Sequence, residues 1–248
     1  MRKHLSTIIL ILVFLTGLSL LLYPTVSDYW NSMHQSRAIV DYTQKVSDID
    51  QALYDQTWAA AQAYNRTLPE KENRYTLSEA EQEEYDSLLD ISGNGIMGYI
   101  EIPAIKCSLP ICHGTDEAVL HSAIGHLEGT SLPVGGTGTH CVLSGHRGLP
   151  SARLFTDLDQ LEEGDLFLLR VLDETLTYEV DQILIVLPTE MAALAIEEEQ
   201  DYCTLVTCTP YGVNSHRLLV RGHRVENQAD ASSIRVTADA MQIEPLIV

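Results

Sequence analysis

The chain opens with one long apolar segment. Four residues, two of them basic (Arg2 and Lys3), precede an uncharged run over residues 5–23, which is close to the roughly 20 residues that a helix needs to cross a bilayer. The positive-inside rule then places the N-terminus in the cytoplasm and the rest of the chain outside. The run is long for a cleaved signal peptide and no Ala-x-Ala site follows it. We therefore expect an uncleaved anchor, with a signal peptide as the alternative.

A helical pattern follows the apolar segment. Apolar and aromatic residues recur at helical spacing over residues 26–64, with polar residues between them, which predicts an amphipathic helix. Examples are Ile39, Tyr42, Val46, Ile49, Leu53 and Trp58. The next stretch, 65–94, is rich in charged residues and asparagine. Within it Ser78 and Glu81 have the spacing of a capping box, so we expect a short helix to begin at Ser78.

From residue 96 the pattern changes to short β-type runs. Runs of Ile, Val, Leu, Thr and Tyr alternate with Gly, Pro and Asp turns, which is typical of a β-barrel or sandwich. Such runs include 98–102, 141–143, 166–169, 176–180, 183–186, 202–207 and 217–220. Helical turns are expected near 116–121, 154–161 and 189–196.

These patterns divide the chain into four parts. We expect a cytoplasmic tip and membrane anchor over 1–24, a helical juxtamembrane segment over 25–95, and a mainly β domain with short helices over 96–226. A polar tail occupies 227–248. Its apolar end is too short to span a membrane.

Composition narrows the class of protein. Hydrophobic residues make up 45% of the 248 residues, so a buried core can form. Lysine and arginine number 15 against 35 aspartates and glutamates, a formal net charge of −20, which argues against nucleic-acid binding. At most, this acidity favours a cationic partner such as a substrate that presents lysines. Five cysteines without a CxxC pair predict neither a disulfide framework nor a zinc ribbon.

Three residues at the ends of apolar runs have the chemistry for acyl transfer. They are His146, Cys208 and Arg217. A cysteine attacks an amide as its thiolate, and an imidazolium supports that ion pair and then protonates the leaving amine. Arginine offers a planar set of N–H donors to the oxyanion. Cys208 ends one run and Arg217 begins the next, so a hairpin would bring them together. Taken singly, each also has an ordinary structural interpretation.

The sequence around these residues resembles the sortases. TLVTCTPY at 204–211 and NSHRLLVRG at 214–222 are similar to the family's active-site hairpin, a TLxTC signature followed by an arginine. Four further stretches resemble class C, the pilus-assembling sortases. These are SGHRGLP at 144–150, LFTDL at 154–158, GHLEGTSLP at 125–133 and YPTVSDY at 23–29. The resemblance extends from the anchor to about residue 225.

The resemblance implies a sortase-type closed β-barrel and a cysteine transpeptidase at the outer face of a Gram-positive membrane. It maps Cys208 onto the nucleophile, His146 onto the acid/base and Arg217 onto the oxyanion or substrate-positioning arginine. Cys208 would attack the Thr–Gly bond of an LPxTG-like sorting signal and form a thioester, and a pilin lysine would resolve it into an isopeptide bond. The implied partners are pilin or surface proteins with such signals. No metal or organic cofactor is implied.

Two features depart from the class C pattern. Many class C members carry an Asp-Pro-aromatic lid motif ahead of the barrel, and no Asp-Pro dipeptide occurs between residues 65 and 95. Many members also have a C-terminal membrane span. We therefore expect anchoring through the N-terminal helix alone, and we do not assume autoinhibition by that motif.

Three alternatives to a pilus-assembling enzyme stay open. One is a sortase that attaches proteins to a cell-wall cross-bridge amine, and another is a sortase that mainly hydrolyses. The third belongs to a different class: a non-catalytic, membrane-anchored surface module such as a pilin or adhesin. The chain lacks the C-terminal sorting signal that such a module would carry. A papain-like protease is disfavoured because its cysteine precedes its histidine.

Overall fold

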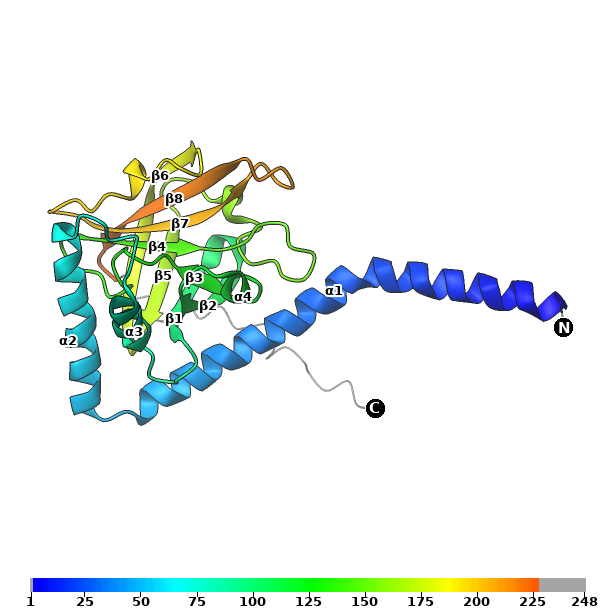
Figure 1. The fold of residues 1–248 in the computed structure, drawn as a ribbon, viewed down its shortest axis with the longest axis horizontal. Coiled ribbons are helices and arrows are strands. Elements are labelled where there is room, and N and C mark those ends of the chain that lie inside the picture. Colours follow the sequence, from blue (N-terminus) through cyan, green and yellow to red (C-terminus); the bar gives the residue numbers. More distant parts are fainter. Residues whose placement is uncertain (1, 228–248) are drawn as a thin grey trace.

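A closed β-barrel forms the body of the molecule (Figure 1). The computed structural model describes residues 2–227, so all but the first residue of the predicted tail lies outside the described residues. Within that range eight strands follow the order β1-β2-β3-β4-β7-β8-β6-β5 around the barrel. The strands are β1 (Ile96–Ile102), β2 (Cys107–His113), β3 (Ile124–His126), β4 (Thr139–Ser144), β5 (Leu166–Val171), β6 (Glu174–Val186), β7 (Asp201–Thr209) and β8 (His216–Val225). The predicted mainly β barrel is confirmed.

Helices precede the barrel and interrupt it. They are α1 (Arg2–Asp48), α2 (Gln51–Thr67), η1 (Leu68–Glu70), α3 (Glu79–Ser87), η2 (Pro103–Ile105), α4 (Glu117–Leu120), η3 (Leu158–Gln160) and η4 (Ala192–Leu194). Helices α4, η3 and η4 fall in the three stretches predicted as helical turns. As predicted, Ser78 and Glu81 form both halves of a capping box at the start of α3.

The single helix predicted over 26–64 is in fact two helices. Helix α1 continues through Pro24 and ends at Asp48, and α2 begins after Asp50. Asp50 has an extended backbone, with φ −78° and ψ 160°, and its carboxylate accepts a 2.8 Å hydrogen bond from the backbone N–H of Leu53. A side-chain cap of this kind starts a new helix. The spacing of apolar residues gives no sign of this break between the two helices.

The strand predictions differ from the structure at three places. Strands β2 and β3 were not among the predicted runs. Strand β2 contains Pro110, which cannot donate to a ladder, and β3 has only three residues. Strand β6 unites the runs 176–180 and 183–186, with an irregular register between Val180 and Gln182.

The order of the strands places three chain segments at one end of the barrel. Strands β4 and β7 pair in parallel up to Ser144 and Val206. Strands β7 and β8 form an antiparallel hairpin. The end of β4, the end of β7 and the start of β8 therefore lie next to one another, with the turn over 210–215 beyond them.

The N-terminal helices pack on the barrel through buried tyrosines. Tyr42 of α1 donates a 2.9 Å hydrogen bond to the carbonyl oxygen of Met97 and accepts one of 2.8 Å from the N–H of Leu172. Tyr85 of α3 lies 2.8 Å from Nδ1 of His126. These contacts attach residues 42–87 to the barrel.

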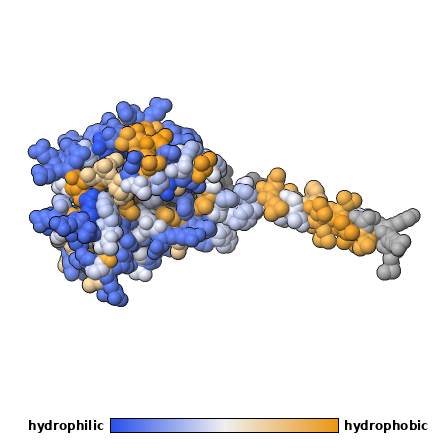
Figure 2. All heavy atoms as spheres, turned by 45° about the horizontal axis from the view of Figure 1, so that its top comes forward, coloured by the Kyte–Doolittle hydropathy of each residue, from blue (hydrophilic) through white to orange (hydrophobic). Residues whose placement is uncertain are grey.

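The first part of α1 is apolar and does not pack on the barrel. Among the described residues, α1 is the one helix long and apolar enough to cross a bilayer, and its apolar part is not buried by the rest of the chain. Figure 2 shows this part as an apolar rod that extends from a largely hydrophilic domain.

Candidate active site

Cys208 and Arg217 are direct cross-strand partners. Cys208 near the end of β7 pairs with Arg217 near the start of β8. Side chains of directly opposed residues in an antiparallel pair lie on the same face of the sheet and contact each other. Both residues are partly exposed. The hairpin expected from the sequence is therefore present, with the thiol and the guanidinium on one face.

The backbone of the β7–β8 turn holds the arginine. Its Nη1 donates to the carbonyl oxygens of Asn214, at 3.3 Å, and His216, at 3.1 Å. Asn214 has a φ of 60°, in the left-handed region that asparagine tolerates better than most residues. Among residues 2–227 its other N–H groups make no hydrogen bond, so they are available to a ligand.

Hydrogen bonds between β4 and β7 bring His146 to the same place. The N–H of Gly145 donates to the carbonyl oxygen of Val206 at 3.0 Å, and Oγ1 of Thr207 donates to the carbonyl oxygen of Gly145 at 2.8 Å. These bonds continue the parallel register, in which position 146 comes opposite position 208. The structure thus brings the three predicted site residues to one end of the barrel.

Gly145 is required for this approach. A Cβ built at this position would lie 2.7 Å from Cδ2 of Phe155 and 3.0 Å from Cγ2 of Ile124. A side chain here would push the segment that carries His146 away from β7. The N–H of Phe155 also donates to the carbonyl oxygen of His146 at 3.0 Å, which fixes the backbone from its other side.

The pKa of His146 lies below its usual value. Partial burial is the main cause, because it disfavours the charged imidazolium, and the positive charge of His121 acts in the same direction. Glu117 opposes both effects. The neutral imidazole is thereby favoured near neutral pH, and in that form it can accept a proton from a thiol or an amine.

Cys208 differs from most of the other cysteines in exposure. Cys107, Cys141 and Cys203 are buried, and Cys112 is partly exposed. Burial raises the pKa of Cys107 to about 12 and that of Cys112 to about 11. Neither thiol ionises at neutral pH, which fits an inert structural role for both.

An apolar groove of about 250 Å³ has Arg217 in its wall. It is lined by Thr115, Leu120, Leu127, Val142, Ser144, Val186, Leu187, Pro188, Glu190, Met191, Leu194, Val206, Arg217 and Leu219. Val206 and Cys208 are two residues apart on β7, and two-residue spacing places side chains on one face of a strand. Arg217 and Leu219 have the same relation on β8. The groove therefore leads toward the thiol.

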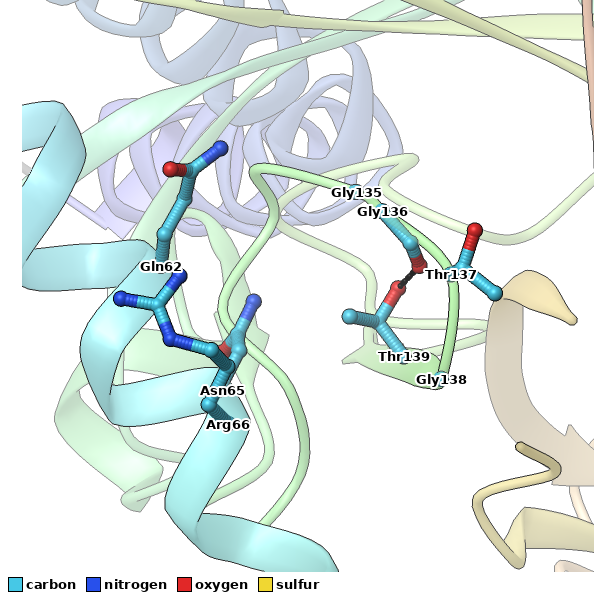
Figure 3. Close-up of a pocket in the computed structure, with 8 residues that line it drawn as sticks. All are labelled: Gln62, Asn65, Arg66, Gly135, Gly136, Thr137, Gly138 and Thr139. Atoms are coloured by element: carbon cyan, nitrogen blue, oxygen red, sulfur yellow. Dashed lines mark hydrogen bonds between the residues drawn. The ribbon is translucent and has the colours of Figure 1, made fainter. Parts of the chain in front are cut away.

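A second cavity, of about 190 Å³, lies at the opposite end of the barrel. Figure 3 shows its walls: Gln62, Asn65 and Arg66 of α2 face the glycine-rich loop over 135–138, where Thr139 donates to the carbonyl oxygen of Gly136. Strand β4 begins here, whereas His146 follows its other end. No nucleophilic thiol lines this cavity, so we do not assign the chemistry to it. Within residues 2–227 no cluster of three or more His, Cys, Asp or Glu side chains is arranged to hold a metal ion.

Sequence reasoning missed the walls of the groove. The largest group comes from the connection between β6 and β7, including Leu187, Met191 and Leu194, and Leu127 follows β3. The segment before α3 borders the same region, because Nη2 of Arg74 donates to the carbonyl oxygen of Leu194 at 3.1 Å. The available signal was the run of large apolar residues after the strand at 183–186, with Leu187 before the predicted helical turn at 189–196 and Met191 and Leu194 within it.

Comparison with known proteins gives the family. Residues 100–225 match the family model described as "Sortase domain". Sortase D of Bacillus subtilis (strain 168) is 32% identical over 131 residues, which cover 52% of this chain and 63% of that protein. Among solved structures, sortase C1 of Streptococcus agalactiae is 52% identical, with a TM-score of 0.74 over 77% of this chain and 100% of that chain. Sortase C of Streptococcus pneumoniae is 45% identical, with a TM-score of 0.70 over 78% and 98%.

The chain belongs to the sortase family, whose members are cysteine transpeptidases. Its structural neighbours include several sortase C structures at 40–52% identity, and within the family it is a class C sortase.

Proposed function

We propose that this chain is a membrane-anchored transpeptidase that cleaves an LPxTG-like sorting signal and transfers the acyl group to a lysine amine of a pilin subunit. One observation carries the proposal: Cys208 and Arg217 are cross-strand partners, and the β4–β7 register brings His146 to them. The thiol, imidazole and guanidinium that acyl transfer requires thus meet at the end of an apolar groove.

In the first step Cys208 attacks the threonine carbonyl as its thiolate. His146 takes the thiol proton and gives it to the departing glycine amine. Arg217 donates N–H groups to the oxyanion, a contribution of about 3–4 kcal/mol for a fixed donor at that position. The thioester at Cys208 then holds the amino-terminal part of the substrate.

In the second step a lysine amine attacks the thioester. Lysine is mostly protonated at neutral pH, so the attacking amine must lose a proton. Neutral His146, favoured by the lowered pKa of its imidazole, can accept that proton. The net charge of −20 favours the approach of a cationic acceptor. Attack by water instead would give hydrolysis.

The groove supports recognition of an extended peptide with a bulky apolar residue. Its walls are mostly Leu, Val, Met and Pro side chains, with Arg217 at one end and Glu190 among them. The leucine of an LPxTG-like signal would bury its side chain there, at roughly 1.5–3 kcal/mol for a fully buried leucine. The similarity to a sortase C described for its pilin substrate specificity supports pilins as the substrate class.

We also propose a role for each of three segments of the chain. Residues 1–24 would anchor the protein in the membrane of a Gram-positive cell, 25–95 would join the anchor to the barrel, and 96–226 would carry the catalysis on the extracellular side. The exposed apolar part of α1 supports the anchor. The packing of Tyr42 and Tyr85 on the barrel supports a rigid junction.

The experiment that tests this function identifies the covalent product. The full chain is mixed with a pilin that carries an LPxTG-like signal and, in parallel, with a peptide that carries a cell-wall cross-bridge amine. We expect mass spectrometry to find an isopeptide bond between the threonine and a pilin lysine, and no product with Cys208→Ala. A product with the cross-bridge amine alone would point to cell-wall anchoring, and the free acid alone would point to a hydrolase.

A further inference from the structure

The connection between the apolar segment and the catalytic domain is short and helical. Helix α1 is continuous from residue 2 to residue 48. Its first hydrogen bond to the domain is at Asp28, whose Oδ1 accepts from the N–H of Arg153 at 2.8 Å. Asp28 lies five residues beyond the apolar run, about 8 Å along the helix at 1.5 Å per residue. No flexible linker separates the anchor from the domain.

The contacts along α1 show which end of the domain is nearest the anchor. Asn31 donates to the carbonyl oxygen of Ser151 at 2.8 Å, so the loop that follows His146 lies beside the start of the helix contacts. Tyr42, which binds the N–H of Leu172 at the β5–β6 turn, lies about 28 Å beyond the apolar run by the same rise. The end of the barrel with His146, Cys208 and Arg217 therefore lies nearer the apolar run of α1, and the β5–β6 turn lies farther from it.

The β7–β8 turn lies beside the loop nearest the anchor. A Cβ built at Gly148 would come within 2.8 Å of the ring of Tyr211, and the guanidinium of Arg147 lies 5.8 Å from the centre of that ring. Figure 1 shows the turn projecting from the barrel on the side where the N-terminal half of α1 leaves it. At the tip, Tyr211 is 60% exposed and Val213 is 69% exposed.

Helix α1 also has exposed aromatic residues close to the end of its apolar run. Tyr23, the last residue of the apolar run, is 57% exposed, and Tyr29 and Trp30, just beyond the run, are 55% and 64% exposed. Tyrosine and tryptophan are enriched at the membrane–water interface, where the ring is apolar and the polar tip stays in water. The start of α1 and the β7–β8 turn thus both present aromatic and apolar side chains at one end of the domain.

We propose that the β7–β8 turn, through Tyr211 and Val213, docks on the outer surface of the membrane that holds α1. This rests on the proposed anchor. Docking would hold the groove and Cys208 just above the lipid headgroups. A sorting signal that is itself held in the membrane by an apolar tail presents its scissile bond at that height. The partner of this surface is the lipid interface of the protein's own membrane.

Quenching of tryptophan fluorescence by brominated lipid tests the docking. The full chain is placed in phosphatidylcholine nanodiscs, with or without bromine on the acyl chains. The chain has two tryptophans, and Trp30→Phe removes the one near the interface, which leaves Trp58 as a constant background. Into this parent are placed Val213→Trp at the turn, Phe14→Trp in the span, and Asp173→Trp at the exposed β5–β6 turn, far from the membrane.

We expect strong quenching with Phe14→Trp, about half as much with Val213→Trp, as for a side chain at the headgroup–acyl boundary, and none above the parent with Asp173→Trp. Quenching in Val213→Trp no greater than in Asp173→Trp, with Phe14→Trp quenched, would overturn the docking and leave the anchor in place. An unquenched Phe14→Trp would overturn the anchor, and the docking with it. Neither result bears on the chemistry at Cys208, which the product analysis tests separately.

Discussion

Thr207 and Gly145 join the chain segments that carry the proposed nucleophile, Cys208, and the proposed acid/base, His146. Oγ1 of Thr207 donates a 2.8 Å hydrogen bond to the carbonyl oxygen of Gly145, in a buried position. Thr207 immediately precedes Cys208, and Gly145 immediately precedes His146. Together with the bond from the N–H of Gly145 to the carbonyl oxygen of Val206, the Thr207 bond holds the segment before His146 against the strand that carries Cys208.

Replacing Thr207 with valine should reduce both catalysis and stability. Thr207→Val keeps the shape but leaves the Gly145 carbonyl without this donor, at a cost of about 1–3 kcal/mol in unfolding free energy. We expect kcat for an LPxTG-type peptide to fall tenfold or more, because small displacements of reacting groups cost about that or more. Steady-state kinetics and thermal unfolding measure the two effects.

Thr204→Val is the matched control for this change. Thr204 is buried on the same strand, and its hydroxyl pairs with Nε2 of His140 at 2.7 Å, away from the site. We expect a similar loss of stability and nearly normal kcat. Equal losses of kcat in both variants would show that Thr207 acts through general stability and does not position His146 and Cys208.

Replacing single cysteines with alanine should distinguish the role of Cys208 from that of the buried Cys203. Cys208→Ala removes the thiol at the site and should abolish peptide cleavage. Cys203→Ala alters a fully buried residue of the core and should retain most activity. A fluorogenic peptide assay on folded samples of both distinguishes them. If the two variants lose activity to the same extent, Cys208 is not the nucleophile.

Replacing Arg217 with lysine should be severe although the charge is kept. An ammonium cannot reproduce the planar set of donors, and loss of one oxyanion donor costs about 10²–10³ in kcat. Arg221→Lys is the control, since Arg221 lies on the same strand and pairs with Asp181 at 2.9–3.0 Å. We expect that variant to remain active. Near-normal turnover by Arg217→Lys would remove Arg217 from the mechanism.

Two neighbours should shift the pKa of His146 in opposite directions. Glu117 raises this pKa and His121 lowers it, so Glu117→Gln should move the midpoint further down and His121→Gln should move it up. NMR titration of the imidazole at low salt measures both shifts, since salt screens such interactions. In the unchanged protein the midpoint should lie below the ordinary value of about 6.5. A midpoint above that value would contradict the burial of the ring.

The same shift affects stability with pH. Because the folded state holds the pKa of His146 below its unfolded value, the unfolded state binds more protons as pH falls through that window. The protein should therefore lose some stability as pH falls below the unfolded pKa of histidine. His146→Gln should lose less over the same range. Thermal unfolding across pH 5–7.5, compared between the two, gives the difference.

The sequence predicted the barrel and the hairpin that carries Cys208 and Arg217 because both have strong local signals. Short β-type runs with turns between them indicate the strands, and Cys208 and Arg217 flank a turn, so their pairing follows from a hairpin. The position of His146 relative to Cys208 was harder to predict from the sequence. It depends on a parallel pairing between β4 and β7, which are more than fifty residues apart in sequence, and on the side-chain bond from Thr207.

Three other features of the fold could not be predicted from the pattern of apolar and polar residues. The break between α1 and α2 depends on the side-chain cap of Asp50, which interrupts an otherwise continuous helical period. Strand β2 contains a proline and β3 is short, so neither resembles a typical strand. Part of the groove is built from the connection between β6 and β7, through residues such as Met191 and Leu194, which reach the site only through the tertiary fold.

The most direct test of the account is the mass of the acyl-enzyme. The protein is incubated briefly with an LPxTG-type peptide in the absence of an acceptor amine, quenched in acid and digested. We predict a thioester that carries the peptide up to its threonine, on the fragment that contains Cys208, and its conversion to an isopeptide when a pilin lysine is supplied. An acyl group on another cysteine, or cleavage without any covalent intermediate, would contradict the account.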